Sequence, residues 1–350
     1  MDLHKYQSVS LYGAGTIGKE THRFLSSINI QVNFFLDQKK KGNLLEKKII
    51  SPSKKNAKEF PNVIISIFNA FVDIDILVKD LKMMGYNVIC SFTDIYYNHS
   101  NSFPNKYWLV NPEVYISNKN LINSFSDLLS DNISKNLLKN IYDFRTTGDS
   151  SYLSKPDLSN QYFPNDISNW LNFKELRFMD IGGYDGDTIL NMYEKGFTVD
   201  QAIIFEPDTE NLKKLVKNVR LHRDNLTIIP NGVFSKITQL SFNLNQDGSS
   251  SISNSENNNS VTVQCLDIDS CFYNFKPNFI KMDIEGAELE ALKGASETII
   301  KHKPNLAISL YHKPQDLWEI PNFIKSLRND YKFYLRSHGH LTFDSVLYCI

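Results

Sequence analysis

"MDIGGYDGDT", residues 179–188, joins a glycine turn to several carboxylates directly after an apolar segment. Glycine in such a turn lets a ligand approach the backbone closely. The carboxylates of Asp185 and Asp187 would repel a bound pyrophosphate at low effective dielectric, and they would favour a ligand that carries positive charge. The stretch therefore predicts a strand–turn–helix unit of an α/β domain that binds a ligand without phosphate.

A further carboxylate follows in "FEPD", residues 205–208, at the end of the next predicted strand. Glu206 is placed there to accept hydrogen bonds from both hydroxyls of a ribose. S-adenosylmethionine has a ribose, a sulfonium and an ammonium but no phosphate. In the alternative reading Asp187 only caps the helix that begins near Thr188. Capping leaves Asp180, Asp185 and Glu206 unexplained, so we expect S-adenosylmethionine as the cofactor.

A different glycine turn, "LYGAGTIGKE", occupies residues 11–20. Gly13, Gly15 and Gly18 form a strict G-x-G-x-x-G motif after a predicted strand, and Asp37 ends the following strand. This is the dinucleotide fingerprint, in which the glycines admit a pyrophosphate and the acid binds ribose hydroxyls. Residues 1–92 contain no obvious hydride-transfer site. A nicotinamide nucleotide, another nucleotide such as a sugar nucleotide, and a structural turn without a ligand all remain open.

Strand and helix patterns alternate over the first ninety residues and again from residue 176, which is typical of βαβ units and a parallel sheet. Two predicted strands at the C-terminus form an antiparallel pair. We therefore expect an α/β protein with a Rossmann-like accessory domain (1–95), a helical connecting segment (96–172) and a second doubly wound domain (173–350). The polar stretch at 245–260 indicates a mobile loop.

Composition narrows the classes of binding partner and the cellular compartment that we expect. The 350 residues include 38 basic and 39 acidic ones, and no Lys/Arg block suggests nucleic acid. The four cysteines lack metal-site or disulfide-scaffold spacing, and no apolar run reaches the length of a membrane span. We expect a cytoplasmic protein without an integral membrane segment. An exposed sheet edge leaves room for a homodimer.

Four motifs in order, "MDIGGYDGDT", "FEPD", "KMDIEGAELEALKGA" (281–295) and "LAISLYHKPQDLWEIP" (306–321), resemble the FkbM-type S-adenosylmethionine-dependent methyltransferases. The resemblance covers roughly residues 170–350. It implies the class I methyltransferase fold, a seven-stranded sheet whose last strand is antiparallel. It also implies O-methylation, because the acceptors of the family are mainly hydroxyls, many of them on sugars of surface glycans.

The resemblance also implies roles for individual positions. The glycine turn would lie beside the methionine moiety, Glu206 on the ribose and residues 231–233 near the adenine. The expected cofactor-binding residues are Asp180, Gly182, Gly183, Tyr184, Asp185, Gly186, Asp187, Thr188, Glu206, Pro207, Asn231, Gly232 and Val233.

Methyl transfer to an alcohol benefits from a base that removes the hydroxyl proton. Asp283, His312 and His340 are the catalytic candidates, at or beyond the ends of predicted strands where ligands of open α/β sheets bind. Backbone hydrogen bonding of His312 and plain solvent exposure of His340 are the alternatives. Asp283, Glu285 and Glu288 offer oxygen ligands for Mg²⁺, but Glu288 also suits a helix start, and we expect no metal.

The sequence thus predicts an S-adenosylmethionine-dependent O-methyltransferase. Its acceptor is expected to be a small molecule or glycan, a sugar or a nucleotide sugar. Two other functions stay open: a nicotinamide-dependent sugar oxidoreductase built on the N-terminal glycine motif, and a non-catalytic nucleotide-sugar-binding module.

Overall fold

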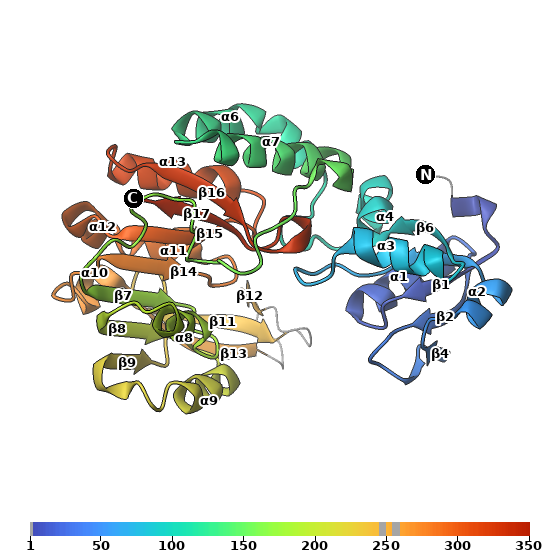
Figure 1. Cartoon of the computed structure of the whole chain (residues 1–350), viewed down its shortest axis with the longest axis horizontal. Coiled ribbons are helices and arrows are strands. Elements are labelled where there is room, and N and C mark those ends of the chain that lie inside the picture. Colours follow the sequence, from blue (N-terminus) through green and yellow to red (C-terminus); the bar gives the residue numbers. More distant parts are fainter. Residues whose placement is uncertain (1–2, 245–249, 254–259) are drawn as a thin grey trace. The chain divides into compact units, whose positions relative to one another are not determined.

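The computed structural model describes residues 3–244, 250–253 and 260–350, so most of the loop predicted at 245–260 lies outside the described residues (Figure 1). The chain divides into two compact units. The first comprises Met1–Ser117, Asn140–Lys155 and Gly339–Phe343, and the second comprises Asn118–Lys139, Pro156–His338 and Asp344–Ile350. Residues of the segment 96–172 are found in both units, and the domain boundaries expected from the sequence stay predictions.

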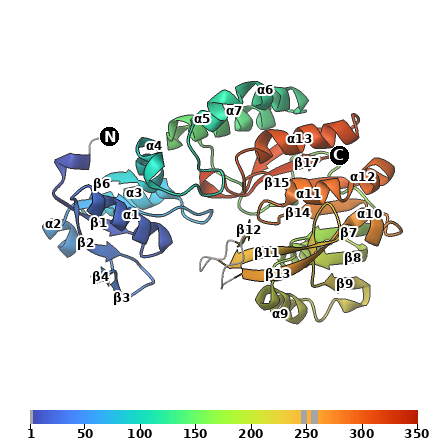
Figure 2. The same cartoon turned by 180° about the vertical axis from the view of Figure 1, so that it is seen from behind.

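The first unit contains a six-stranded sheet in the order β3-β4-β2-β1-β5-β6 (Figure 2). Its central strands are parallel, and β3 alone runs antiparallel to its neighbour β4. The strands are β1 (Ser8–Tyr12), β2 (Gln31–Leu36), β3 (Gly42–Leu44), β4 (Lys47–Ile50), β5 (Asn62–Ile65) and β6 (Asn87–Ser91). The alternation predicted β1, β2, β5 and β6. It missed β3 and β4, which are short and largely polar.

The helices of this region are α1 (Thr16–Ser27), α2 (Lys54–Glu59), α3 (Ile74–Met83), α4 (Phe92–Asn98), α5 (Glu113–Ser117) and α7 (Asn132–Thr147), with 3₁₀ turns η1 (Leu3–Lys5), η2 (Ser100–Ser102), η3 (Ser150–Tyr152) and η5 (His340–Thr342). Helix α7 begins in the second unit and ends in the first. None of the helices in the described part of the chain has the length and apolar character that a bilayer span needs.

The second unit contains a seven-stranded sheet in the order β16-β17-β15-β14-β7-β8-β9. Strand β17 runs antiparallel to both β15 and β16, whereas β15, β14, β7, β8 and β9 are mutually parallel. The strands are β7 (Leu176–Ile181), β8 (Val199–Phe205), β9 (Leu226–Ile229), β14 (Phe279–Met282), β15 (Asn305–Ser309), β16 (Phe333–Ser337) and β17 (Ser345–Cys349). The predicted α/β class and the antiparallel last strand are confirmed.

The helices of the second unit are α6 (Lys119–Leu128), α8 (Asp187–Glu194), α9 (Thr209–Asn218), α10 (Ile268–Cys271), α11 (Glu288–Lys293), α12 (Ser296–His302) and α13 (Asp316–Leu327), with the 3₁₀ turn η4 (Arg223–Asn225). Helix α6 packs against α13 (Figure 1). A smaller sheet joins β10 (Gly232–Val233), β11 (Thr238–Leu244), β12 (Ser250–Ser253) and β13 (Ser260–Leu266) in the order β10-β13-β11-β12.

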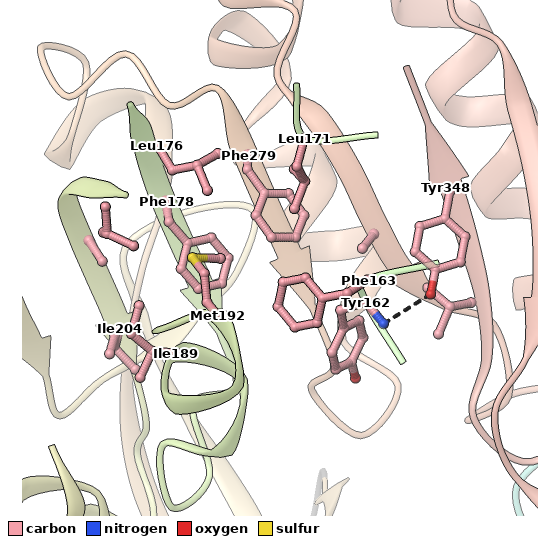
Figure 3. Packing of buried hydrophobic residues seen from close by; sticks show 14 of the residues in the cluster. Tyr162, Phe163, Leu171, Leu176, Phe178, Ile189, Met192, Ile204, Phe279 and Tyr348 are labelled. Atoms are coloured by element: carbon pink, nitrogen blue, oxygen red, sulfur yellow. Dashed lines mark hydrogen bonds between the residues drawn. The ribbon is translucent and has the colours of Figure 1, made fainter. Parts of the chain in front are cut away.

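The core on one face of the seven-stranded sheet is closed by the segment that precedes β7 (Figure 3). Phe178 and Phe279 stack with ring centroids 4.7 Å apart. Tyr162 and Phe163 enter the same cluster, and the backbone N–H of Tyr162 donates to the hydroxyl of Tyr348 at 3.0 Å. This anchor fixes the side chain of Tyr162 at the carboxyl end of the strands, where the candidate site lies.

Candidate active site

The glycine turn after β7 is built so tightly that side chains cannot enter it. Gly182 has φ +94°, and a Cβ on it would lie 2.0 Å from the carbonyl oxygen of Asp283. A Cβ on Gly183 would lie 2.2 Å from the side chain of Ile204. Gly186, with φ +90°, is the residue that precedes α8. The turn therefore exposes backbone rather than side chains to a ligand.

Glu206 lies beside this turn and is held by backbone donors. Its Oε2 accepts from the N–H of Tyr184 and its Oε1 from the N–H of Asp208, each at 2.8 Å. The side chain is buried, and this burial raises the pKa of Glu206 to about 7 although the two N–H groups oppose the shift. Each carboxylate oxygen keeps accepting capacity beyond its backbone bond. The carboxylate is thus oriented for two neighbouring hydroxyl donors.

A buried ion pair lies under the turn. Lys281 stands opposite Asp180 in the β14–β7 register, and its Nζ is 3.1 Å from Asp180 Oδ1. The same ammonium donates to the carbonyl of Gly182. Burial raises the pKa of Asp180 to about 6 against the influence of Lys281, and the neighbouring carboxylates raise the pKa of Lys281 against its own burial. Asp180 therefore stabilises the turn indirectly, by pairing with the Lys281 ammonium that donates to the Gly182 carbonyl.

The other acids of the turn lie nearer to solvent. Asp187 is the first residue of α8, and its Oδ1 accepts from the N–H of Thr188 at 2.8 Å. The carbonyl of Asp185 accepts from the side chain of Asn218. Tyr184 is exposed and has φ +46°. The carboxylates of Asp185 and Asp187 thus keep a region of negative charge at the start of α8.

Residues 231–233 follow β9, the strand beside β8 in the seven-stranded sheet. The amide of Asn231 donates to the carbonyl of Gln264, and Gly232 and Val233 form β10, which pairs with β13. Pro207 directly follows Glu206 and is half-buried. Glu206 and Asn231 thus lie just beyond the ends of the neighbouring strands β8 and β9, whereas Gly232 and Val233 belong to the smaller sheet. The adenine contact of residues 231–233 stays a prediction.

Asp283 follows β14 and receives hydrogen bonds from two tyrosines. Tyr162 donates to its Oδ2 at 2.7 Å, and Tyr311 donates to its Oδ1 at 3.1 Å. Burial alone would raise the pKa of Asp283, but the charges of His312 and Lys281 and the bond from Tyr162 keep that pKa below its usual range. The carboxylate is ionised at neutral pH.

His312 follows β15 and lies among carboxylates. Its Nδ1 is 2.8 Å from Glu288 Oε1, and its Nε2 is 3.4 Å from Asp283 Oδ1 and 3.7 Å from Glu285 Oε2. Burial would lower its pKa, but the charges of these neighbours raise the pKa of His312 to about 10. The surrounding carboxylates therefore favour the imidazolium form of His312, which can orient them.

The third catalytic candidate is assigned to the other unit. His340 belongs to the first unit, where its N–H donates to the carbonyl of Ala70 at 2.9 Å. The structure brings Asp283 and His312 together within the second unit. The roles predicted for all three stay predictions.

The N-terminal glycine turn has its own geometry. Gly13 has φ +116°, and a Cβ on it would lie 2.6 Å from the carbonyl oxygen of Ser66. A Cβ on Gly18 would lie 2.2 Å from the carbonyl of Gly13, whereas Gly15 faces open space. Asp37 accepts from the N–H of Ala14 at 3.1 Å. The ligand of this turn stays a prediction.

Sequence reasoning missed several residues of the site. Lys281 gave a signal that could have been used, since a lysine inside an apolar strand needs a buried partner. Tyr162 gave none, because it lies 121 residues before the carboxylate to which it donates. Tyr311 and Glu288 lie inside quoted motifs, but nothing in those motifs tells which side chains meet.

Comparisons with known proteins agree with this geometry. Residues 180–339 match the family model described as the methyltransferase FkbM domain. No curated protein matches the chain significantly. A solved structure of the methyltransferase FkbM from Methylobacillus flagellatus KT superposes with a TM-score of 0.76 at 23% identity, over 98% of this chain and 90% of that one.

Other solved structures are similar over a smaller part. Fibrillarin of Aeropyrum pernix with natively bound S-adenosyl-L-methionine has a TM-score of 0.30 at 10% identity, over 50% of this chain and 66% of that one. A SAM-dependent methyltransferase from Aquifex aeolicus has a TM-score of 0.32 at 15% identity, over 57% and 95%. Residues 180–339 thus match the FkbM methyltransferase model, and the chain shares the fold of a solved FkbM methyltransferase, including the seven-stranded sheet.

Proposed function

We propose that the protein is an S-adenosylmethionine-dependent O-methyltransferase whose acceptor is a sugar hydroxyl, in the synthesis of a surface glycan or polysaccharide. The methyltransferase domain supports the reaction class. The choice of cofactor rests on Glu206. This buried carboxylate is held by two backbone N–H groups beside a glycine turn that excludes side chains.

The proposed cofactor pose uses each of these features. The ribose hydroxyls donate to Glu206, whose oxygens are acceptors only. The methionine end follows the backbone of 182–186, where Asp185 and Asp187 lower the free energy of a sulfonium and an ammonium. The adenine lies against residues 231–233. No phosphate is needed, which separates this site from the dinucleotide type.

Methyl transfer requires the acceptor oxygen, the methyl carbon and the sulfur in line. Asp283 lies on the acceptor side in this pose, because its backbone carbonyl packs directly against Gly182. An alcohol must lose its proton as the new C–O bond forms and the C–S bond breaks, and the carboxylates of Asp283 and Glu285 are at hand to receive it. The choice of a sugar rests on the resemblance of the motifs.

Calorimetric titration with S-adenosylhomocysteine tests the cofactor, with NAD⁺ as the competing ligand. We expect micromolar binding of S-adenosylhomocysteine and a loss of about tenfold or more in Glu206→Ala, since a charge-assisted acceptor disappears. Glu210→Ala is the matched control, because Glu210 is an exposed acid of neighbouring helix α9 that pairs with Lys213. Binding of NAD⁺ alone would overturn the proposal in favour of the N-terminal glycine motif.

Turnover is then measured as formation of S-adenosylhomocysteine with a panel of free sugars and nucleotide sugars. Sugar-dependent turnover would establish the acceptor class. Turnover with a non-sugar alcohol alone would support the proposed O-methyltransferase activity and contradict the proposed sugar acceptor.

A further inference from the structure

Three metal-ligating side chains converge at the acceptor side of the sheet. Asp283 follows β14, Glu288 begins α11 and His312 follows β15. One ligand atom from each lies within 4.8 Å of the others. We propose that Asp283, Glu288 and His312 bind a single divalent cation, and that this cation holds the acceptor hydroxyl.

The three ligands are presented by the sheet itself. Strands β14 and β15 are neighbours in parallel register, so Asp283 and His312 leave the same edge. Two donors bound to one ion at about 2.1 Å lie at most about 4.2 Å apart. Side-chain rotations that shift donors by a few tenths of an ångström to about 1 Å would therefore close the site around an ion.

Burial and charge make this cluster different from a group of surface acids. Glu288 is fully buried and the His312 side chain is 2% exposed. The second oxygen of Glu288, Oε2, is buried without a hydrogen-bond partner within the described part of the chain. A buried carboxylate oxygen with no donor is costly, and a bound cation would satisfy it.

Around the three ligands, carboxylates also outnumber the cationic side chains, which are His312, Lys281 and Lys313. Glu285 lies 3.7 Å from the imidazole, and the buried Asp316 accepts from the N–H of Lys313. The ammonium of Lys313 is directed to the carbonyl of Gly286. Four carboxylates thus surround one imidazole, an arrangement that a divalent ion would balance.

The carboxylate and imidazole donors narrow the choice of ion. Carboxylates suit Mg²⁺, Ca²⁺ and Mn²⁺, whereas imidazole favours first-row transition ions. Mn²⁺ accepts both donor types and is our probe. Asp283 is the partly exposed member of the set, with 22% of its side chain accessible, so the open coordination position faces the acceptor side.

The catalytic role of the ion rests on the proposed function, whereas its binding does not. An acceptor hydroxyl bound to the cation would be more acidic. Its proton would pass to Glu285, the more exposed carboxylate of the cluster. The lone pair of the deprotonated acceptor oxygen would then form the new C–O bond. The C–S bond would break at the same time with its electrons staying on sulfur, giving the methyl ether and S-adenosylhomocysteine.

The competing interpretation is a purely structural network. Glu288 Oε1 accepts from the N–H of Ile284 at 2.8 Å and from that of Gly286 at 3.4 Å, so the residue also shapes the loop after β14. A structural network would hold an imidazolium between carboxylates and would bind no ion.

Titration of the chelator-treated full chain with Mn²⁺, followed by electron paramagnetic resonance of the free ion, separates the two. We expect one Mn²⁺ per chain at sub-millimolar affinity, with affinity reduced by about tenfold or more in Asp283→Asn and in His312→Gln. Glu290→Gln is the matched control: Glu290 belongs to the same helix as Glu288 but bonds to Lys293 and Ser235. Its Mn²⁺ binding should equal that of the unchanged protein.

Titration of the same samples with S-adenosylhomocysteine reports folding and keeps the two proposals apart. Absence of Mn²⁺ binding, or equal binding in Asp283→Asn and His312→Gln, in samples that bind S-adenosylhomocysteine would overturn the cation site alone. Mn²⁺ binding without S-adenosylhomocysteine binding would overturn the proposed function and retain the ion.

Discussion

The two glycine turns of the chain share a design and differ in charge. In each, an acid at the end of the second strand accepts from an N–H in the turn and from the N–H two residues beyond itself: Asp37 from Ala14 and Lys39, Glu206 from Tyr184 and Asp208. The first glycine of each turn lies against the carbonyl of a residue that directly follows an adjacent strand: Gly13 against Ser66 after β5, and Gly182 against Asp283 after β14. Backbone geometry alone therefore does not distinguish the two sites.

The surrounding charges do distinguish them. Lys39 and Lys40 also donate their N–H groups to Asp37, and the ammonium of Lys40 bonds to the carbonyl of Ala14. The second turn instead carries the carboxylates of Asp185 and Asp187. One scaffold is thus biased toward an anionic ligand and the other toward a cationic one. The two turns therefore differ in the charge of the ligand they favour because of the side chains around them, and not because of their backbone.

The largest contrast in stability is expected from the side chains that donate to the carbonyls of the two turns, Lys281 and Ser66. Lys281→Met leaves Asp180 buried without its counter-charge, so we expect a loss of about 3–5 kcal/mol in the free energy of unfolding. In the first turn Ser66 Oγ donates to the carbonyls of Tyr12 and Gly13, and Ser66→Ala should cost only about 1–2 kcal/mol. Urea unfolding of both variants measures the difference. Equal losses would mean that the buried pair contributes no more than neutral hydrogen bonds.

Close packing should give the next contrast. Gly182→Ala would place a Cβ 2.0 Å from a carbonyl oxygen at φ +94°, and we expect a destabilisation of about 3 kcal/mol together with lost cofactor binding. Gly15→Ala meets no atom within 4 Å and has an ordinary φ of −105°, so its stability should change by less than about 0.5 kcal/mol. Thermal melting of the two variants is the measurement. A stable Gly182→Ala variant would show that the turn can relax.

These contrasts also show what the sequence could reveal. The spacing from glycine turn to strand-end acid is local, so Glu206 and Asp37 were identified correctly as strand-end residues beside their turns. Asp283 and His312 are each predicted at a strand end on the ligand-binding edge, and the structure places His312 Nε2 3.4 Å from Asp283 Oδ1. The approach of Tyr162 depends on how a non-repetitive segment packs on the sheet, which no periodicity encodes.

The metal expectation shows the same limit. Asp283, Glu285 and Glu288 were considered as ligands from the spacing of one motif. The structure instead groups Asp283 and Glu288 with His312, which comes from a different strand. A ligand set that spans two strands is visible only once the sheet register is known.

The two acids should also respond differently to pH. Burial raises the pKa of Glu206 to about 7, whereas hydrogen bonds outweigh burial and lower that of Asp37. A protonated Glu206 offers one acceptor fewer, so affinity for S-adenosylhomocysteine should fall by up to about tenfold per pH unit below 7 and level off above it. Calorimetry from pH 5.5 to about 8.5 checks this sign. Glu206→Gln should bind weakly with a flat profile, and a sloping profile in that variant would assign the titration to another group.

The smallest expected effect tests the charge argument most directly. S-adenosylmethionine carries a sulfonium that S-adenosylhomocysteine lacks, and Asp185 and Asp187 lie at the exposed start of α8. Solvent screening limits each interaction to about 0.2–0.5 kcal/mol, so the double change Asp185→Asn and Asp187→Asn should weaken S-adenosylmethionine binding by roughly two- to fivefold. Binding of S-adenosylhomocysteine should weaken less, because only its ammonium is affected. An equal loss for both ligands would mean that the turn acidity serves the ammonium or the helix start, and that selectivity for the charged sulfur arises elsewhere in the site.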